Sequence, residues 1–172
     1  FYRDFAFGMD GLRVEIGAGT KHMNVYTVAK APQGLTGYLK KNFTEPSVAI
    51  GYDSRINSDV FVKVAIGVFV VNGVKDNIRP VLMLVPIVSL VIRYLHTSAG
   101  VVVTASHNPS KCDGYNGNGE NDCQIITWTA TEIFAEIEKI DIFADVKTNA
   151  FEVGMVNVNV QYIPNETYSA FC

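Results

Sequence analysis

The sequence has 172 residues, of which 48% are hydrophobic and 11% aromatic, and its formal net charge at pH 7 is −3. This length and composition suffice for a packed domain and exclude a chain that is mainly disordered. The negative charge excludes a sequence-independent nucleic-acid binder, which needs a basic surface to neutralise phosphates. A small anionic ligand stays open, because a few local donors are enough to bind it.

The three cysteines form no CxxC pair and are odd in number, which favours free thiols over a disulfide framework or a zinc site. The two longest apolar stretches, 60–71 and 81–92, are interrupted by Lys63 and Pro86 and are shorter than the roughly 20 residues of a membrane span. The first four residues lack the pattern of a signal peptide. We therefore expect a soluble cytoplasmic protein with neither nucleic acid nor membrane as a partner.

A first helix is predicted over residues 25–42, where apolar residues recur at helical spacing. Asn24 is available as its N-cap, and two lysines near its end favour the negative end of the helix dipole. Pro32 lies inside this helix and is expected to kink it.

Strands and helices then alternate along the chain. We expect a buried strand at 47–52, a helix capped by Ser58-Asp59 and running to Asn72-Gly73, a weaker strand at 74–78, a helix at 86–96 and a strand at 100–104. The last strand is a continuous apolar run, typical of burial on both faces of a sheet. Alternation of this kind favours a mainly parallel sheet.

Residues 107–122 are rich in Gly, Asn and Asp and predict a loop, followed by a possible strand at 123–126. Thr129-x-x-Glu132 predicts a capping box that opens a last helix. The inner face of this helix is expected to hold Ala130, Ile133, Phe134, Ile137 and Ile140.

The predicted fold is a three-layer α/β/α domain with a mixed, mainly parallel sheet, spanning residues 1–146. The pattern loosens over 147–172, which we interpret as a linker and the truncated start of a second domain, with Asn165 as the cap of a new helix.

The segment Thr104–Pro109, which reads Thr-Ala-Ser-His-Asn-Pro, follows the apolar strand directly. Ligands bind beyond the carboxyl ends of the strands in open parallel sheets, so Ser106 lies where chemistry is expected. Pro109 keeps Asn108 out of the helical conformation and holds the loop open. A single loop serine more often satisfies local backbone groups, and only its context favours a catalytic role.

Three segments carry a resemblance to a known family. They are Thr104–Pro109 with Gly114-Tyr115 after it, Phe7–Arg13, which reads Phe-Gly-Met-Asp-Gly-Leu-Arg, and Val48–Arg55, which reads Val-Ala-Ile-Gly-Tyr-Asp-Ser-Arg. Together they resemble the phosphoserine domain of the α-D-phosphohexomutases, which include phosphoglucomutases and phosphomannomutases. Residues 17–24 are most similar to the phosphoglucomutase and phosphopentomutase branch.

The resemblance implies that phosphorylated Ser106 donates its phosphoryl group to a phosphosugar, through a bisphosphosugar intermediate. It also implies Mg²⁺ on the serine phosphate and a bisphosphosugar activator of the glucose 1,6-bisphosphate type. Arg13 and His107 are the expected cationic donors, with Asn108 and Lys111 as further phosphate contacts. The alternatives are a surface ion pair with a carboxylate for Arg13 and no phosphate contact for His107.

The sequence departs from the family at several positions. Asn116 stands where the family commonly has a lysine that is a candidate general acid or base, Met9 replaces a threonine, and Leu84-Val85-Pro86 replaces Pro-Thr-Pro. The metal-binding and sugar-recognition parts of the family belong to later domains. Residues 1–172 are therefore expected to carry the phosphoryl group and to be inactive without those domains.

Two alternative functions follow from the same residues. A non-catalytic relic that binds a phosphosugar or a partner protein is favoured by Asn116. A doubly wound phosphatase would need an aspartate nucleophile, for which Asp53 is the only candidate, in surroundings that fit poorly. We expect Asp53 and Arg55 to fix the loop after their strand.

Overall fold

Strands and helices alternate through the parts of the chain that the computed structural model describes, which are residues 12–54, 56–78, 85–104, 112–119, 127–147 and 160–162. In chain order the elements are β1 (Leu12–Glu15), α1 (Val25–Asn42), β2 (Ser47–Tyr52), α2 (Ser58–Val71), β3 (Lys75–Ile78), α3 (Val85–Leu95), β4 (Ala99–Val103), β5 (Cys112–Gly119), α4 (Thr127–Glu138) and β6 (Val160–Tyr162).

The strands form one sheet with the order β1-β5-β4-β2-β3-β6. The pairs β2–β3, β2–β4 and β3–β6 are parallel, whereas β5 runs antiparallel to both β4 and β1. All five residues of β4 and the four central residues of β2 are buried, as suits apolar strands covered on both faces. The prediction of a mixed, mainly parallel sheet is confirmed.

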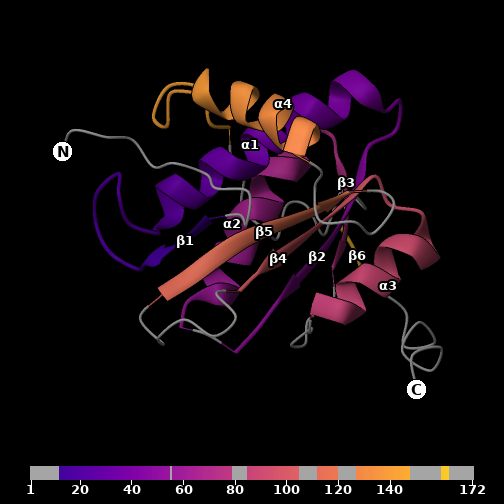
Figure 1. The fold of residues 1–172 in the computed structure, drawn as a ribbon, viewed down its shortest axis with the longest axis horizontal. Helices are drawn as coiled ribbons and strands as arrows, with labels where there is room; N and C mark the ends of the chain where they lie inside the picture. Colours follow the sequence, from indigo (N-terminus) through magenta and orange to yellow (C-terminus); the bar gives the residue numbers. More distant parts are fainter. Residues whose placement is uncertain are drawn as a thin grey trace.

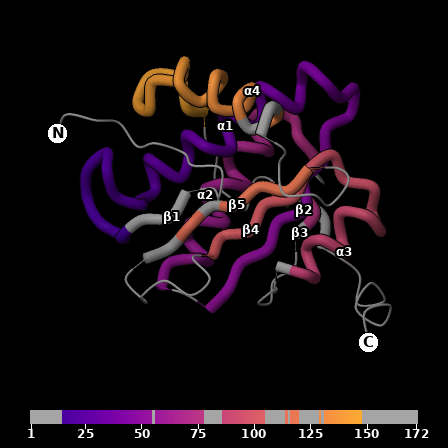
Figure 2. Tube along the Cα trace, viewed as in Figure 1, coloured from indigo at the N-terminus to yellow at the C-terminus, as the bar shows by residue number. Residues whose placement is uncertain are grey.

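Helices cover both faces of this sheet (Figure 1). Residues of α1, α2 and α4 pack with Ile50 and Val101 in the larger hydrophobic cluster. Residues of α3 pack with Ala49 and Val102 in a second cluster on the other face. The Cα trace shows α3 across the strands from α1 and α4 (Figure 2). This arrangement is the three-layer α/β/α domain predicted from the sequence.

The N-terminus of α1 is held by the predicted cap. The Asn24 Oδ1 atom accepts hydrogen bonds from the backbone N–H groups of Tyr26 and Thr27, both at 3.1 Å. The Thr27 hydroxyl accepts one from the Asn24 N–H at 3.0 Å, which completes a capping box. The predicted helix 25–42 is therefore confirmed, and it continues through the buried Pro32.

Two predicted caps are wrong. Helix α2 has Asn57 as its N-cap, in the left-handed conformation with φ of 65°, and Ser58 is already its first helical residue. Helix α4 begins at Thr127, so the sequence pattern at Thr129 and Glu132 lies inside its first turns and does not mark its N-terminus. Both segments contain several cap-forming residues close together, Asn-Ser-Asp at 57–59 and threonines at 127, 129 and 131, and local preference alone does not choose among them.

The predicted loop over 107–122 is wrong in part, because residues 112–119 form β5. This strand is rich in Gly and Asn, which have low strand propensity. Its pairing with β4 on one side and β1 on the other supplies the backbone hydrogen bonds that override this propensity. Strands β1 and β6 were not predicted either, since they are short and are defined by distant partners.

Some predictions concern residues outside the described ranges, namely the strand at 123–126 and the helix cap at Asn165. The domain boundary after residue 146 stays a prediction, and the chain returns beyond it to add β6 beside β3. No helix in the described ranges is both long enough and apolar enough to span a membrane.

Candidate functional site

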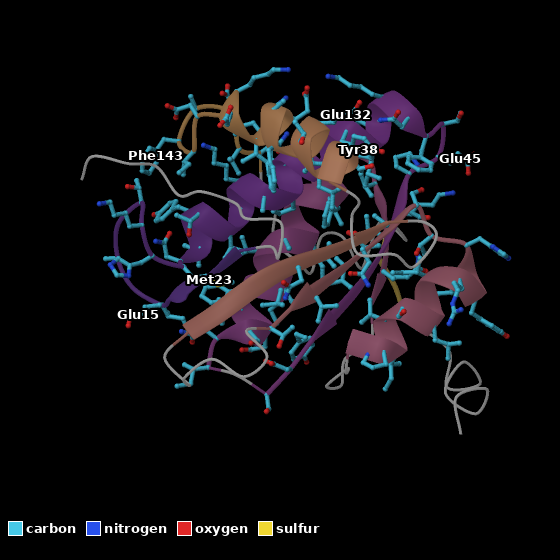
Figure 3. The ribbon with its side chains drawn as sticks, in the orientation of Figure 1. Glu15, Met23, Tyr38, Glu45, Glu132 and Phe143 are labelled. Carbon is cyan, nitrogen blue, oxygen red and sulfur yellow. The ribbon has the colours of Figure 1, made fainter. Side chains whose placement is uncertain are left out.

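The site is built at the sheet edge where β2 and β4 end. These strands are parallel neighbours with Tyr52 opposite Val103, so Asp53 and Thr104 leave the sheet side by side. The Asp53 N–H donates to the Val103 carbonyl at 3.3 Å. Figure 3 shows Glu15, the last residue of β1, far across the molecule from Glu45, which precedes β2.

Hydrogen bonds to Gly114, Asp53 and Asn116 are among those that hold Thr104 at this edge. Its N–H donates to the Gly114 carbonyl at 2.8 Å, and its hydroxyl donates to the Asp53 Oδ2 atom at 2.6 Å. The Asn116 Nδ2 atom donates to the Thr104 carbonyl at 2.9 Å. The Thr104 residue is only 5% exposed, so water competes little for these bonds. Thr104 is thus the fixed point from which the chain continues toward Ser106.

Asp53 also connects this edge to helix α2. The Ser58 hydroxyl donates to the Asp53 Oδ1 atom at 3.3 Å, and Ser58 is fully buried. One carboxylate therefore joins the end of β2, the end of β4 and the first turn of α2. The expectation that Asp53 fixes the chain after its strand agrees with this geometry, whereas Arg55 lies outside the described residues.

Asn116, which stands where the resemblance leads us to expect a lysine, holds Thr104 in this structure. It lies on β5 opposite Val102, and its Nδ2 atom holds the Thr104 carbonyl. Its Oδ1 atom is buried and has no hydrogen-bond partner within the described ranges. An amide of this kind neither takes up nor releases a proton at physiological pH, so its contribution here is geometric.

Arg13 lies on the same row of the sheet as Thr104. Strand β1 places Arg13 opposite Gly114, and the Gly114 carbonyl accepts the bond from Thr104. Two strand spacings separate the backbones of Arg13 and Thr104, which is about 10 Å. The register therefore places the backbone of Arg13, the predicted hydrogen-bond donor to phosphate, on the row of the sheet that ends at Thr104.

The other predicted site residues lie outside the described ranges: Ser106, His107, Asn108 and Lys111. Their roles stay predictions. Sequence analysis missed the hydroxyl of Thr104 and the tether from Asn116. The signal for the first was available, because the residues after two neighbouring parallel strands, here Asp53 and Thr104, meet at one edge.

No group of three or more His, Cys, Asp or Glu side chains comes together as a metal site within the described residues. The carboxylate of Asp53 is bonded to the hydroxyls of Thr104 and Ser58. These residues therefore do not by themselves form the oxygen-rich cage that Mg²⁺ prefers.

An open groove of about 570 Å³ lies near this edge, lined by residues 16–20, the first turns of α1 and α2, and residues 142–143. The rings of Tyr26 and Phe143 stand 5.7 Å apart beside it. Its lining is mostly apolar. A phosphosugar needs polar and cationic donors, so the groove is a poorer candidate for that ligand than the edge at Thr104.

The fold and the edge define the class of the protein: an open α/β/α domain with its candidate site beyond the carboxyl ends of the central strands. Residues 4–143 match the family model described as phosphoglucomutase/phosphomannomutase, alpha/beta/alpha domain I. The chain belongs to this family, as its first domain.

Curated relatives agree with this assignment. The chain is 42% identical over 138 residues to a probable phosphoribomutase of Schizosaccharomyces pombe, a match that covers 77% of this chain and 23% of the relative. It is 31% identical over 168 residues to a phosphoglucomutase of Staphylococcus haemolyticus, with 98% of this chain and 29% of the relative covered. The chain thus spans less than a third of the length of these relatives.

Solved structures share the fold. A putative phosphomannomutase from Thermus thermophilus superposes with a TM-score of 0.78 at 21% identity, over 94% of this chain and 33% of the other. A phosphoglucomutase from Paramecium, in an open form, gives a TM-score of 0.71 at 21% identity, over 81% of this chain and 26% of the other.

Proposed function

We propose that this chain is the phosphoserine-bearing domain of a mutase that moves a phosphoryl group between two hydroxyls of one phosphosugar. The observation that carries the proposal is the segment Thr104–Pro109 at the end of buried β4, in a chain that matches the first domain of the mutase family. In this proposal the product is a sugar 6-phosphate or 5-phosphate formed from the 1-phosphate.

The proposed mechanism begins with phosphate on the Ser106 hydroxyl oxygen. A sugar hydroxyl attacks this phosphorus, the bond to the serine oxygen breaks, the proton of the sugar hydroxyl passes to the serine oxygen, and a bisphosphosugar forms. The intermediate then reverses its orientation in the site. The serine oxygen attacks its other phosphate, which regenerates phosphoserine and releases the isomeric phosphosugar. Positioning and charge stabilisation dominate such transfers, and the fixed edge at Thr104 supports the first requirement.

Charge stabilisation is assigned to cationic side chains and to a metal ion. Arg13 is proposed as a donor to the phosphate, with His107, Asn108 and Lys111 contributing from the loop itself. Mg²⁺ on the Ser106 phosphate would neutralise developing charge, as in other phosphoryl transfers. Its remaining ligands are assigned to residues outside those described.

The remaining domains and a bisphosphosugar activator belong to the proposal as partners of this domain. The relatives are more than three times as long as their matched segments, which leaves room for parts that recognise the sugar. Residues 1–172 are accordingly proposed to accept a phosphoryl group but not to complete turnover alone.

A non-catalytic relic is the second candidate, and Asn116 is the observation that favours it. This residue replaces the proton-transferring lysine of the resemblance and instead holds the Thr104 carbonyl. In this reading the phosphosugar or a partner protein still binds, and isomerisation does not occur.

Phosphopeptide mass spectrometry separates these candidates. The protein carrying its remaining domains is incubated with glucose 1,6-bisphosphate and Mg²⁺, digested, and assayed in parallel for conversion of glucose 1-phosphate to the 6-phosphate. The mutase proposal predicts phosphate on Ser106 and turnover, and S106A is expected to lose both. A wild-type protein with neither would sink the mutase proposal and favour the relic.

A further inference from the structure

We infer that Asp53 and Thr104 form a positioning pair that fixes the serine loop for phosphoryl transfer, an inference that rests on the proposed function. The pair is defined by the 2.6 Å hydrogen bond from the Thr104 hydroxyl to the Asp53 Oδ2 atom. The two residues are 51 positions apart in the sequence and meet only because β2 and β4 are parallel neighbours.

The bond has the features of a strong interaction. A short hydroxyl-to-carboxylate bond is charge-assisted and about twice as strong as one between neutral groups. Thr104 is buried, which protects the bond from competing water. Threonine supplies this donor through a β-branched side chain that also has few rotamers, so the hydroxyl is held in one direction.

Asp53 is itself held from two further sides. Its N–H donates to the Val103 carbonyl at 3.3 Å, and its Oδ1 atom accepts from the Ser58 hydroxyl at 3.3 Å. The carboxylate therefore links Thr104 to the end of β2 and to the first turn of α2. In the sequence, only Ala105 separates the anchored Thr104 from Ser106.

This anchoring matters for transfer because the serine phosphate must line up with the attacking hydroxyl. A misplacement of about 1 Å in such a reaction costs on the order of a hundredfold in rate. The pair touches neither the substrate nor the transferred group in this inference. It acts through Ser106, so its loss is expected to change kcat and leave KM unaltered.

A matched control lies at the other end of the same strand. Thr97 precedes β4, is 1% exposed, and its hydroxyl donates to the Ala99 carbonyl at 3.2 Å. Changing Thr97 to Val removes a buried hydroxyl bond from β4, as the same change at Thr104 does. It does so at the amino end of β4, away from Thr104, so a loss of kcat in both variants would point to a purely structural effect.

The test compares T104V, T104S and T97V in the protein that carries its remaining domains. T104V is expected to lower kcat by about tenfold to a hundredfold with KM unchanged. T104S, which keeps the hydroxyl, is expected to restore kcat, and T97V to leave it unchanged. Wild-type kcat in T104V, or the same loss of kcat in T97V, would overturn the inference.

Hydrogen exchange of the peptide covering residues 104–111 makes the test independent of activity. We expect faster exchange in T104V than in wild type or T97V. If the wild-type protein shows neither turnover nor phosphoserine, the proposed function fails. The hydrogen-exchange rates then remain as the test of whether Asp53 and Thr104 fix the segment that follows them. Unchanged exchange in T104V overturns it, and faster exchange confined to T104V supports it.

Discussion

Asp76 is a buried carboxyl group that lacks a hydrogen-bond partner among the described residues, and its replacement is expected to stabilise the protein. It lies on β3, where it pairs with Val48 of β2, and it is 1% exposed. Neither of its oxygens has a hydrogen-bond partner within the described ranges. Burial raises the pKa of this carboxyl well above its ordinary value, since the charged form is poorly solvated there.

The change D76V replaces this group with an apolar side chain suited to a strand. A buried polar group without a partner costs about 1–3 kcal/mol, so the free energy of unfolding should rise by about that amount at neutral pH. For a chain of this size each kcal/mol raises Tm by about 2–4 °C. D76N should raise the free energy of unfolding by less, because its amide also lacks hydrogen-bond partners among the described residues.

The gain should depend on pH with a definite sign. As pH rises above about 3.9, the ordinary pKa of aspartate, Asp76 ionises in the unfolded state and keeps its proton in the folded state. The folded state then binds more protons, and this group lowers wild-type stability progressively as pH rises toward its folded-state pKa. The difference between D76V and wild type should therefore grow from pH 4 to pH 7.

Urea denaturation followed by circular dichroism measures this difference on the 172-residue chain at a series of pH values. D59N is the control, because Asp59 is 56% exposed and its ion pair with Lys63 spans 3.8 Å. Its effect should stay within about 0.5 kcal/mol. A D76V protein that is less stable than wild type, or whose gain does not change with pH, would refute the reasoning.

Two further stability predictions concern helix α1. A Cβ atom on Gly34 would lie 2.2 Å from the Cγ1 atom and 3.1 Å from backbone atoms of Ile137, so G34A should cost about 1–3 kcal/mol by forcing α1 and α4 apart. A Cβ atom on Gly37 would come closest to the flexible end of Glu136, with Oε2 at 3.3 Å, and would meet its Cβ and Cγ atoms at an ordinary 3.7 Å, so G37A should be neutral or stabilising in the same thermal melts. Equal losses in both variants would contradict this contrast. N24A removes the capping box and should cost about 1 kcal/mol, measured by urea unfolding, with an unchanged midpoint as the contrary result.

Local sequence determined those parts of the protein that depend on near neighbours. Helix α1 follows from its apolar spacing and from the Asn24 cap, both readable within a few residues. The apolar runs of β2 and β4 likewise predict central, buried strands and the α/β/α class. The segment Thr104–Pro109 indicated the serine loop and its family without any structure.

Tertiary structure decided the features that join distant residues. Strand β5 forms from residues of low strand propensity because β1 and β4 offer hydrogen bonds on both sides. The bond between Asp53 and Thr104 depends on which strands become neighbours, and the tether from Asn116 depends on the register of β5. The raised pKa of Asp76 arises from burial alone, which no residue near it in the sequence reveals. Long-range pairing and burial are properties of the assembled sheet, and for that reason the sequence predicted the serine segment but not the hydrogen bonds that hold Thr104 before it.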